Sequence, residues 1–105
     1  MIHALKIHPV YFEEVLSGRK TFEVRKNDRN FLMGDLLALN EYDPEKKEYT
    51  GRSALVYVDY AWMDPKYVAE GYAIMSIKPC SVILGSQCEP GDYVVPLAPV
   101  LPEDD

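Results

Sequence analysis

The chain has 105 residues, a formal net charge of −6 and a hydrophobic content of 48%. This length suggests one domain with a single modest core, and the hydrophobic content argues against a disordered chain. The net charge argues against a general nucleic-acid coat, and the sequence shows neither a signal-like apolar start nor an apolar run of roughly 20 residues, so we expect a cytoplasmic protein without a membrane span.

In chain order, the first expected elements are a strand and a short helix. "IHALKI" (residues 2–7) alternates and is rich in β-formers, which predicts a strand. "HPVYFEEVLSG" (8–18) predicts a helix of about two to three turns, with Pro9 in its first turn and Gly18 at its end. The apolar residues of this helix are expected on one face: Tyr11, Phe12, Val15 and Leu16.

Four further strands are expected after the helix. The segment at 20–27, "KTFEVRKN", alternates with period two, so Glu23 and Arg25 share one face and Phe22 and Val24 the other. Strands are also predicted for "LLALNEYD" (36–43), "RSALVYVDYAW" (52–62) and "YAIMSIKP" (72–79), the last closed by Pro79. This order predicts an α+β, mainly β fold: a small, mostly antiparallel barrel with one short helix after the first strand. An open α+β sheet is the structural alternative.

The carboxyl end differs in composition from the rest of the chain. Residues 79–105 contain five acidic and no basic residues and five of the eight prolines, whereas residues 1–78 contain 11 basic and 12 acidic residues. We therefore expect a domain at 1–88, followed by an acidic, Pro-rich arm at 89–105 that is extended or disordered or serves protein interaction.

The segment at 17–35 is unusual because many of its charges lie on a predicted strand. It contains Arg19, Lys20, Arg25, Lys26 and Arg29 around Glu23 and Asp28. On an exposed face such pairs contribute only about 0–1 kcal/mol each, and periodicity alone favours this solvated edge. If the face lines a cleft, a carboxylate flanked by basic groups can accept a hydrogen bond from a base amine while Arg or Lys holds a phosphate.

The same segment carries a family resemblance. "GRKTFEVR" matches the G-x-K-x-x-E-x-R pattern of the ASCH domain, part of the PUA-like superfamily, through Gly18, Lys20, Glu23 and Arg25. Residues 2–78 closely resemble the small bacterial and phage proteins grouped as DUF3850, in which an E-x-R-x-N-D-R run, a G-D and a Y-T-G-R recur in this order.

The resemblance implies a PUA-like β-barrel with a cleft beside the helix that binds RNA or a modified nucleotide. Lys20, Glu23 and Arg25 would face this cleft, and Asn27 and Arg29 would lie at its rim. Asp28 would join the rim, and Gly34–Asp35 would form the turn beneath.

An enzymatic alternative follows from a related ASCH branch that hydrolyses N4-acetylcytidine. That branch has Lys, Thr and Arg at the places that are held here by Lys20, Glu23 and Arg25. Glu23 departs from the pattern, so whether this chain is an enzyme is left open. If it is, Lys20 would act as base or nucleophile. The acid would come from Asp59 or Glu70.

Several other polar and aromatic residues allow two interpretations. Tyr60 and Trp62 are expected in the barrel core, with base stacking as the alternative. His3 and His8 lack ligands at metal spacing, and Cys80 and Cys88 match neither a zinc nor a CxxC pattern. No metal and no cofactor are therefore expected. The hairpin "YDPEKKEYTG" is expected to be solvated, although Lys46, Lys47 and Arg52 could extend a phosphate-binding edge.

Overall fold

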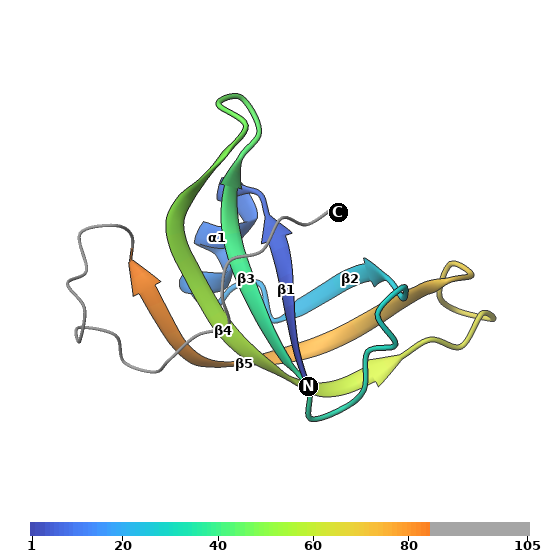
Figure 1. Cartoon of the computed structure of the whole chain (residues 1–105). Coiled ribbons are helices and arrows are strands. Elements are labelled where there is room, and N and C mark those ends of the chain that lie inside the picture. Colours follow the sequence, from blue (N-terminus) through green and yellow to red (C-terminus); the bar gives the residue numbers. More distant parts are fainter. Residues whose placement is uncertain (85–105) are drawn as a thin grey trace.

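A strongly curved sheet with one short helix forms the protein in the computed structural model, which describes residues 1–84 (Figure 1). The predicted arm at 89–105 therefore lies outside the described residues. The elements are β1 (Ile2–Ile7), α1 (Pro9–Leu16), β2 (Phe22–Lys26), β3 (Leu36–Asp43), β4 (Glu48–Trp62) and β5 (Tyr72–Leu84). The predicted mainly β fold with one short helix after the first strand is confirmed.

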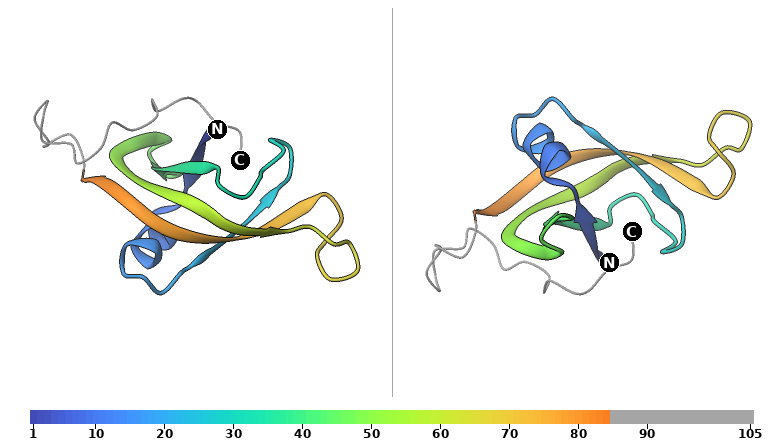
Figure 2. Two further views of the ribbon diagram at one scale, coloured as in Figure 1. Left: turned by 90° about the horizontal axis from the view of Figure 1, so that it is seen from below. Right: turned by 90° about the horizontal axis from the view of Figure 1, so that it is seen from above.

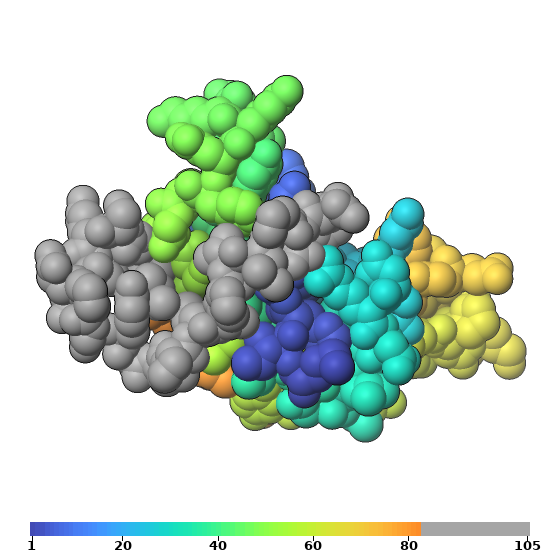
Figure 3. All heavy atoms as spheres, in the orientation of Figure 1, coloured from blue at the N-terminus to red at the C-terminus, as the bar shows by residue number. Residues whose placement is uncertain are grey.

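The five strands form one sheet in the order β1-β3-β4-β5-β2. β1 pairs with β3 in parallel, and every other neighbouring pair is antiparallel. The sheet curls into a half-barrel, and its two edge strands, β1 and β2, face each other across the open side (Figures 1 and 2). Within residues 1–84 no ladder joins these two edges, so the barrel is not closed by strand pairing. The hairpin that joins β3 to β4 projects from the rest of the molecule (Figure 3).

The core fills the concave side of the sheet beneath α1. Its largest side chains include Phe12 of α1 and Phe31 of the β2–β3 loop, both fully buried against Leu37 and Leu39 of β3. Phe12 of the helix is completely buried in this core and the last apolar residues of the helix are partly buried, so most of the predicted apolar face packs inward. Tyr11 is the exception, because it is more than half exposed and does not join the core.

A bulge in β4 changes which face its last residues occupy. The register with β5 shifts between Val58 and Tyr60, so Asp59 is the extra residue. A single inserted residue moves every following side chain to the opposite face of a strand. Val58 is therefore buried, whereas Tyr60 and Trp62 lie on the outer face. The prediction that these two aromatic residues are core is wrong for this reason.

β5 continues beyond the predicted stop at Pro79. The register with β4 shifts between Leu55, which pairs with Ser81, and Val56, which pairs with Pro79, so Cys80 is a second bulge residue. Proline lacks the N–H that a regular ladder needs, and a bulge is one of the few places in a sheet that tolerates it. The strand therefore runs through Pro79 to Leu84.

Two networks of polar and charged side chains connect strands of the sheet to neighbouring segments. Arg52 donates to both oxygens of Glu41, through Nε at 2.7 Å and Nη2 at 2.9 Å, and its Nη2 also reaches Glu13 of α1 at 2.7 Å. Arg52 thus joins β4, β3 and the helix, so its guanidinium serves the fold. At the other end, His3 lies 2.8 Å from a carboxylate oxygen of Asp35.

Within residues 1–84, the single helix is too short to cross a lipid bilayer.

Candidate functional site

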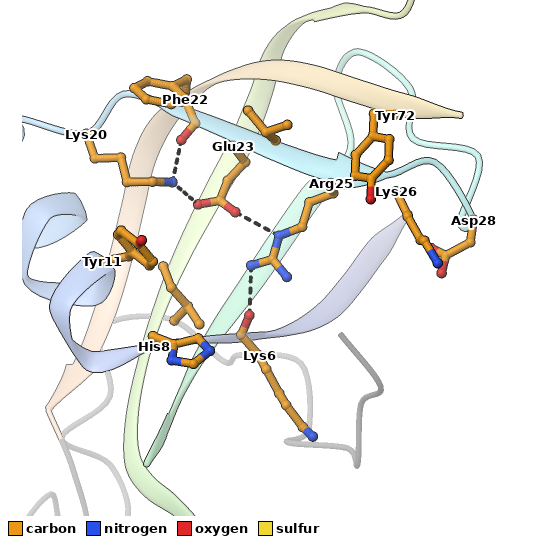
Figure 4. Close-up of a pocket in the computed structure, with 12 residues that line it drawn as sticks. Lys6, His8, Tyr11, Lys20, Phe22, Glu23, Arg25, Lys26, Asp28 and Tyr72 are labelled. Atoms are coloured by element: carbon orange, nitrogen blue, oxygen red, sulfur yellow. Dashed lines mark hydrogen bonds and ion pairs between the residues drawn. The ribbon is translucent and has the colours of Figure 1, made fainter. Parts of the chain in front are cut away.

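A cleft of about 660 Å³ lies on the open side of the half-barrel, between its two edge strands. β1 and the start of α1 form one wall and β2 forms the other (Figure 4). Its lining consists of Lys6, Ile7, His8, Tyr11, Lys20, Phe22, Glu23, Val24, Arg25, Lys26, Asp28 and Tyr72. Four pairings join the five strands, and a fifth pairing, between β1 and β2, would be needed to close the barrel. Because this pairing is absent within residues 1–84, the space between the two edge strands stays open and forms the cleft.

In β2 the charged face is buried and the apolar face is exposed, the reverse of an ordinary edge strand. Glu23 is only 3% exposed, whereas Phe22 and Val24 are 47% and 49% exposed. A half-buried strand normally turns its apolar residues inward. Here the charged face points into the cleft, so the solvated-edge interpretation of this strand is wrong.

Glu23 is the centre of a three-residue ionic cluster at the base of the cleft. One of its carboxylate oxygens accepts a hydrogen bond from Lys20 Nζ, and the other accepts one from Arg25 Nε at 2.8 Å (Figure 4). Lys20 Nζ also donates to the main-chain oxygen of Phe22 at 2.6 Å. Burying a carboxylate is costly unless it is paired and hydrogen-bonded, and both conditions are met here. The cluster retains one excess positive charge.

The turn between α1 and β2 aims Lys20 at this carboxylate. The Gly18 N–H donates to Val15 O at 3.1 Å, and the Lys20 N–H donates to Glu14 O at 3.0 Å. Gly18 has a φ of 82°, a left-handed conformation that suits glycine because it has no Cβ. The chain therefore reverses immediately after the helix, and Lys20 lies at the start of the cleft.

Two arginines bridge the open side of the half-barrel. Arg25 Nη2 donates to Lys6 O at 2.7 Å, and Arg29 Nη1 donates to Ala4 O at 3.0 Å. Both acceptors are alternate main-chain carbonyls of β1 that point away from its partner β3. The guanidinium groups thus satisfy edge carbonyls that a closing strand would otherwise bind.

The rim of the cleft is aromatic. Tyr11 projects from α1, Phe22 from β2 and Tyr72 from the start of β5 (Figure 4). His8 stands beside Tyr11, with 6.4 Å between the ring centroids, and Lys20 Nζ lies 5.1 Å from the centroid of Phe22. Sequence reasoning missed these rings as site residues, although the pairing of an aromatic residue with Lys20 and Glu23 in "KTFE" was a usable signal for Phe22.

The structure separates the remaining candidate residues from the cleft lining. The side chain of Asn27 supports the loop that follows β2, since its Oδ1 accepts from the Phe31 N–H at 3.0 Å. Arg29 reaches β1 as described above. Asp59 lies on the outer face of β4, 3.8 Å from Lys78 Nζ, and Glu70 is exposed in the β4–β5 loop. Of the residues predicted for the site, Lys20, Glu23, Arg25 and Asp28 line the cleft together.

The electrostatics of the cleft differ from those of the whole chain. Four cationic side chains and two carboxylates line it, a surplus of two positive charges in a chain whose net charge is −6. Within residues 1–84, no group of three or more His, Cys, Asp or Glu side chains could hold a metal ion. The arrangement can therefore attract an anion, offer a carboxylate acceptor and stack a planar ring.

Comparisons with known proteins cover most of the described fold. A family model described as "Domain of unknown function (DUF3850)" matches residues 2–77, which include both walls of the cleft. The "Uncharacterized 12.9 kDa protein in GpA 3'region" of Escherichia phage P2 is 47% identical over 51 residues, which are 49% of this chain and 45% of that protein. The chain thus matches less than half the length of this curated relative. Neither description states a ligand or a reaction.

Proposed function

The chain belongs to the DUF3850 family, and we propose that it is a binding module that takes RNA or a nucleotide, modified or unmodified, in the cleft between β1 and β2. The observation that carries this proposal is the buried Glu23 held between Lys20 and Arg25 beneath an aromatic rim. The match of Gly18, Lys20, Glu23 and Arg25 to the ASCH pattern, and with it a place in the PUA-like superfamily, is part of the same proposal.

The chemistry of the cleft fits a nucleotide in three respects. Its volume of about 660 Å³ lies in the range of roughly 300–1,000 Å³ that is typical of small-molecule sites. The surplus positive charge would hold a phosphate, so affinity should fall as salt rises. Tyr11 and Phe22 offer ring faces on which a base could stack.

Glu23 is the group that would select among bases. Within residues 1–84, each of its oxygens accepts a hydrogen bond from one side chain, and a carboxylate oxygen can accept two. A base with an exocyclic amine, such as adenine or cytosine, could donate to the remaining positions, whereas uracil has no such amine. The cleft should therefore prefer AMP or CMP to UMP.

An NMR titration tests the proposal. AMP, CMP, UMP and N4-acetylcytidine are added to ¹⁵N-labelled protein, and we expect amide shifts centred on Lys20, Glu23 and Arg25. Lys20→Met should weaken AMP binding, whereas Lys46→Met, which removes the same charge from the exposed β3–β4 turn, should not. The absence of shifts at the cleft across this panel would overturn the proposal.

The same titration separates binding from hydrolysis. Lys20 is occupied in an ion pair with Glu23, and neither Asp59 nor Glu70 lines the cleft, so the acid that amide hydrolysis requires is not supplied by either candidate. We therefore expect N4-acetylcytidine to be recovered intact. Release of cytidine by the wild-type protein, and its loss in Lys20→Met, would instead support the amidohydrolase alternative.

A further inference from the structure

The outer face of the sheet carries an exposed cluster of aromatic residues on the opposite side of β2 from Glu23. The strand register places Phe22 beside Ser76 and Tyr60, and Val24 beside Ile74 and Trp62, in two rows that cross β2, β5 and β4. Tyr72 lies in the next row, opposite Lys26. The ring of Tyr67, from the β4–β5 loop, lies 5.5 Å from that of Trp62. We name Phe22, Tyr60, Trp62, Tyr67 and Tyr72, with Val24, the aromatic platform.

The exposed area of the platform is large for a small domain. Tyr60 is 58% and Trp62 44% exposed, and Tyr67 is more exposed than either. With 150–250 Å² for each aromatic side chain, the platform presents roughly 600 Å² of accessible surface. The largest apolar patch on a typical monomer is about 300–600 Å² and is often functional. The bulge at Asp59 is what creates this face, since without it Tyr60 and Trp62 would point into the core.

We propose that the aromatic platform stacks the bases of a single-stranded nucleic acid whose leading nucleotide occupies the cleft. This inference rests on the proposed function and extends it from a nucleotide to a strand. Five of the six platform side chains are rings, which suits bases because every base has a π-face to stack. A sheet whose neighbouring strands present aromatic residues on one face is a known arrangement for stacking two or three RNA bases.

The cleft and the platform are continuous. Phe22 of the edge strand β2 and Tyr72 at the start of β5 belong to both, because they line the cleft and also lie on the platform. Lys26 lies at this crossing point, opposite Tyr72, and is exposed. A strand leaving the cleft would pass Lys26 with its phosphates and then meet Trp62 and Tyr60. Lys78 lies at the far end of the platform, where Asp59 is 3.8 Å from its Nζ.

The single tryptophan of the chain makes the platform directly observable. Trp62 emission is recorded while an eight-nucleotide oligoadenylate or AMP is added to the full-length protein. We expect the oligoadenylate to quench Trp62 and to bind more tightly than AMP. Tyr60→Ala, which lies on the platform away from the cleft, should weaken oligoadenylate binding at least about fivefold and leave AMP binding unchanged. Tyr49→Ala, which removes a ring from the β3–β4 hairpin, serves as the control and should alter neither.

The outcomes distinguish the platform from the cleft. Unchanged Trp62 emission, or wild-type affinity of Tyr60→Ala for the oligoadenylate, would overturn the platform even if AMP still shifts the amides of Lys20 and Glu23. Quenching by the oligoadenylate without any AMP-induced shift at the cleft would overturn the proposed function and leave base stacking on the platform supported. A dimer by sedimentation that Tyr60→Ala dissociates, with no quenching, would show that the face binds a second copy of the chain and would overturn the inference.

Discussion

Glu23→Gln should lower the stability of the fold and reveal what this carboxylate does in the cleft. The substitution keeps the shape of the side chain but removes its charge and replaces one acceptor with a donor. Lys20 and Arg25 then lose their shared counter-charge, and one of them loses its hydrogen-bond acceptor. Since both cations lie at the base of the cleft, water can replace the lost partner only in part.

The burial of the three side chains sets the size of the effect. Removing one member of a fully buried ion pair costs about 3–5 kcal/mol. The side chains of Lys20 and Arg25 are 17% and 13% exposed, so they keep some hydration and the cost should be smaller. We expect a loss of about 2–3 kcal/mol. For a domain of this size, 1 kcal/mol changes Tm by about 4–8 °C, which predicts a fall in Tm on the order of 10–20 °C.

Thermal unfolding followed by circular dichroism measures this change, with Glu45→Gln as the control because Glu45 is exposed in the β3–β4 turn. The variant also raises the positive surplus of the cleft by one. The added charge should make UMP bind more tightly. The affinity for AMP should rise less, because AMP also loses the hydrogen bond from its amine to the Glu23 carboxylate. A Glu23→Gln protein that melts within about 2 °C of Glu45→Gln would refute the reasoning, because that cost cannot vanish for a carboxylate buried between two cations.

Three further substitutions test the parts of the fold that position the cleft. Arg52→Ala should cost about 2–4 kcal/mol by urea unfolding, because it leaves the buried Glu41 without its counter-ion. The hydrogen bond from Arg52 lowers the pKa of Glu41, so this carboxylate stabilises the fold above its unfolded pKa, and that contribution is lost as pH falls through the folded value. The variant should therefore lose less stability than the wild type on acidification. Asp35→Asn should also make the free energy of unfolding fall less steeply as pH is lowered. Burial acts to raise the pKa of Asp35, but hydrogen bonds, chiefly from His3, outweigh it and lower the pKa, so the wild-type carboxylate stabilises the fold until it is protonated. Gly34→Ala should cost about 1–3 kcal/mol in the same assay, because residue 34 has a φ of 90° although a Cβ there would meet open space.

Local sequence patterns predicted the strands and the helix well where the pattern stayed regular. The bounds of β1 and β3 match the predicted strands 2–7 and 36–43, and α1 lies within the predicted segment 8–18 with Pro9 in its first turn. β4 begins at Glu48 instead of residue 52, so the polar "EYTG" is strand and not loop. There Thr50 and Arg52 both bind Glu41, which gives the "YTGR" segment a structural role.

The two bulges are what the sequence could not reveal. Nothing in "VYVDYAW" indicates that Asp59 is inserted between paired residues, since an uninterrupted alternation would place Tyr60 with Val58. The inserted residue is recognised only from the pairing with β5, which is a tertiary feature. The same holds for Pro79, whose missing N–H ends a regular strand but is tolerated next to the bulge at Cys80.

The face on which the charges of β2 lie is also a tertiary property. Period-two alternation showed that Glu23 and Arg25 share a face and left open which face is buried. The answer depends on β2 being an edge strand opposite β1, where Arg25 can reach Lys6 O and satisfy an open carbonyl. Arg25 therefore connects β2 to β1 through one nitrogen and binds Glu23 through another. Lys20 binds the other oxygen of Glu23, so the bridge from Arg25 to β1 does not depend on the lysine contact.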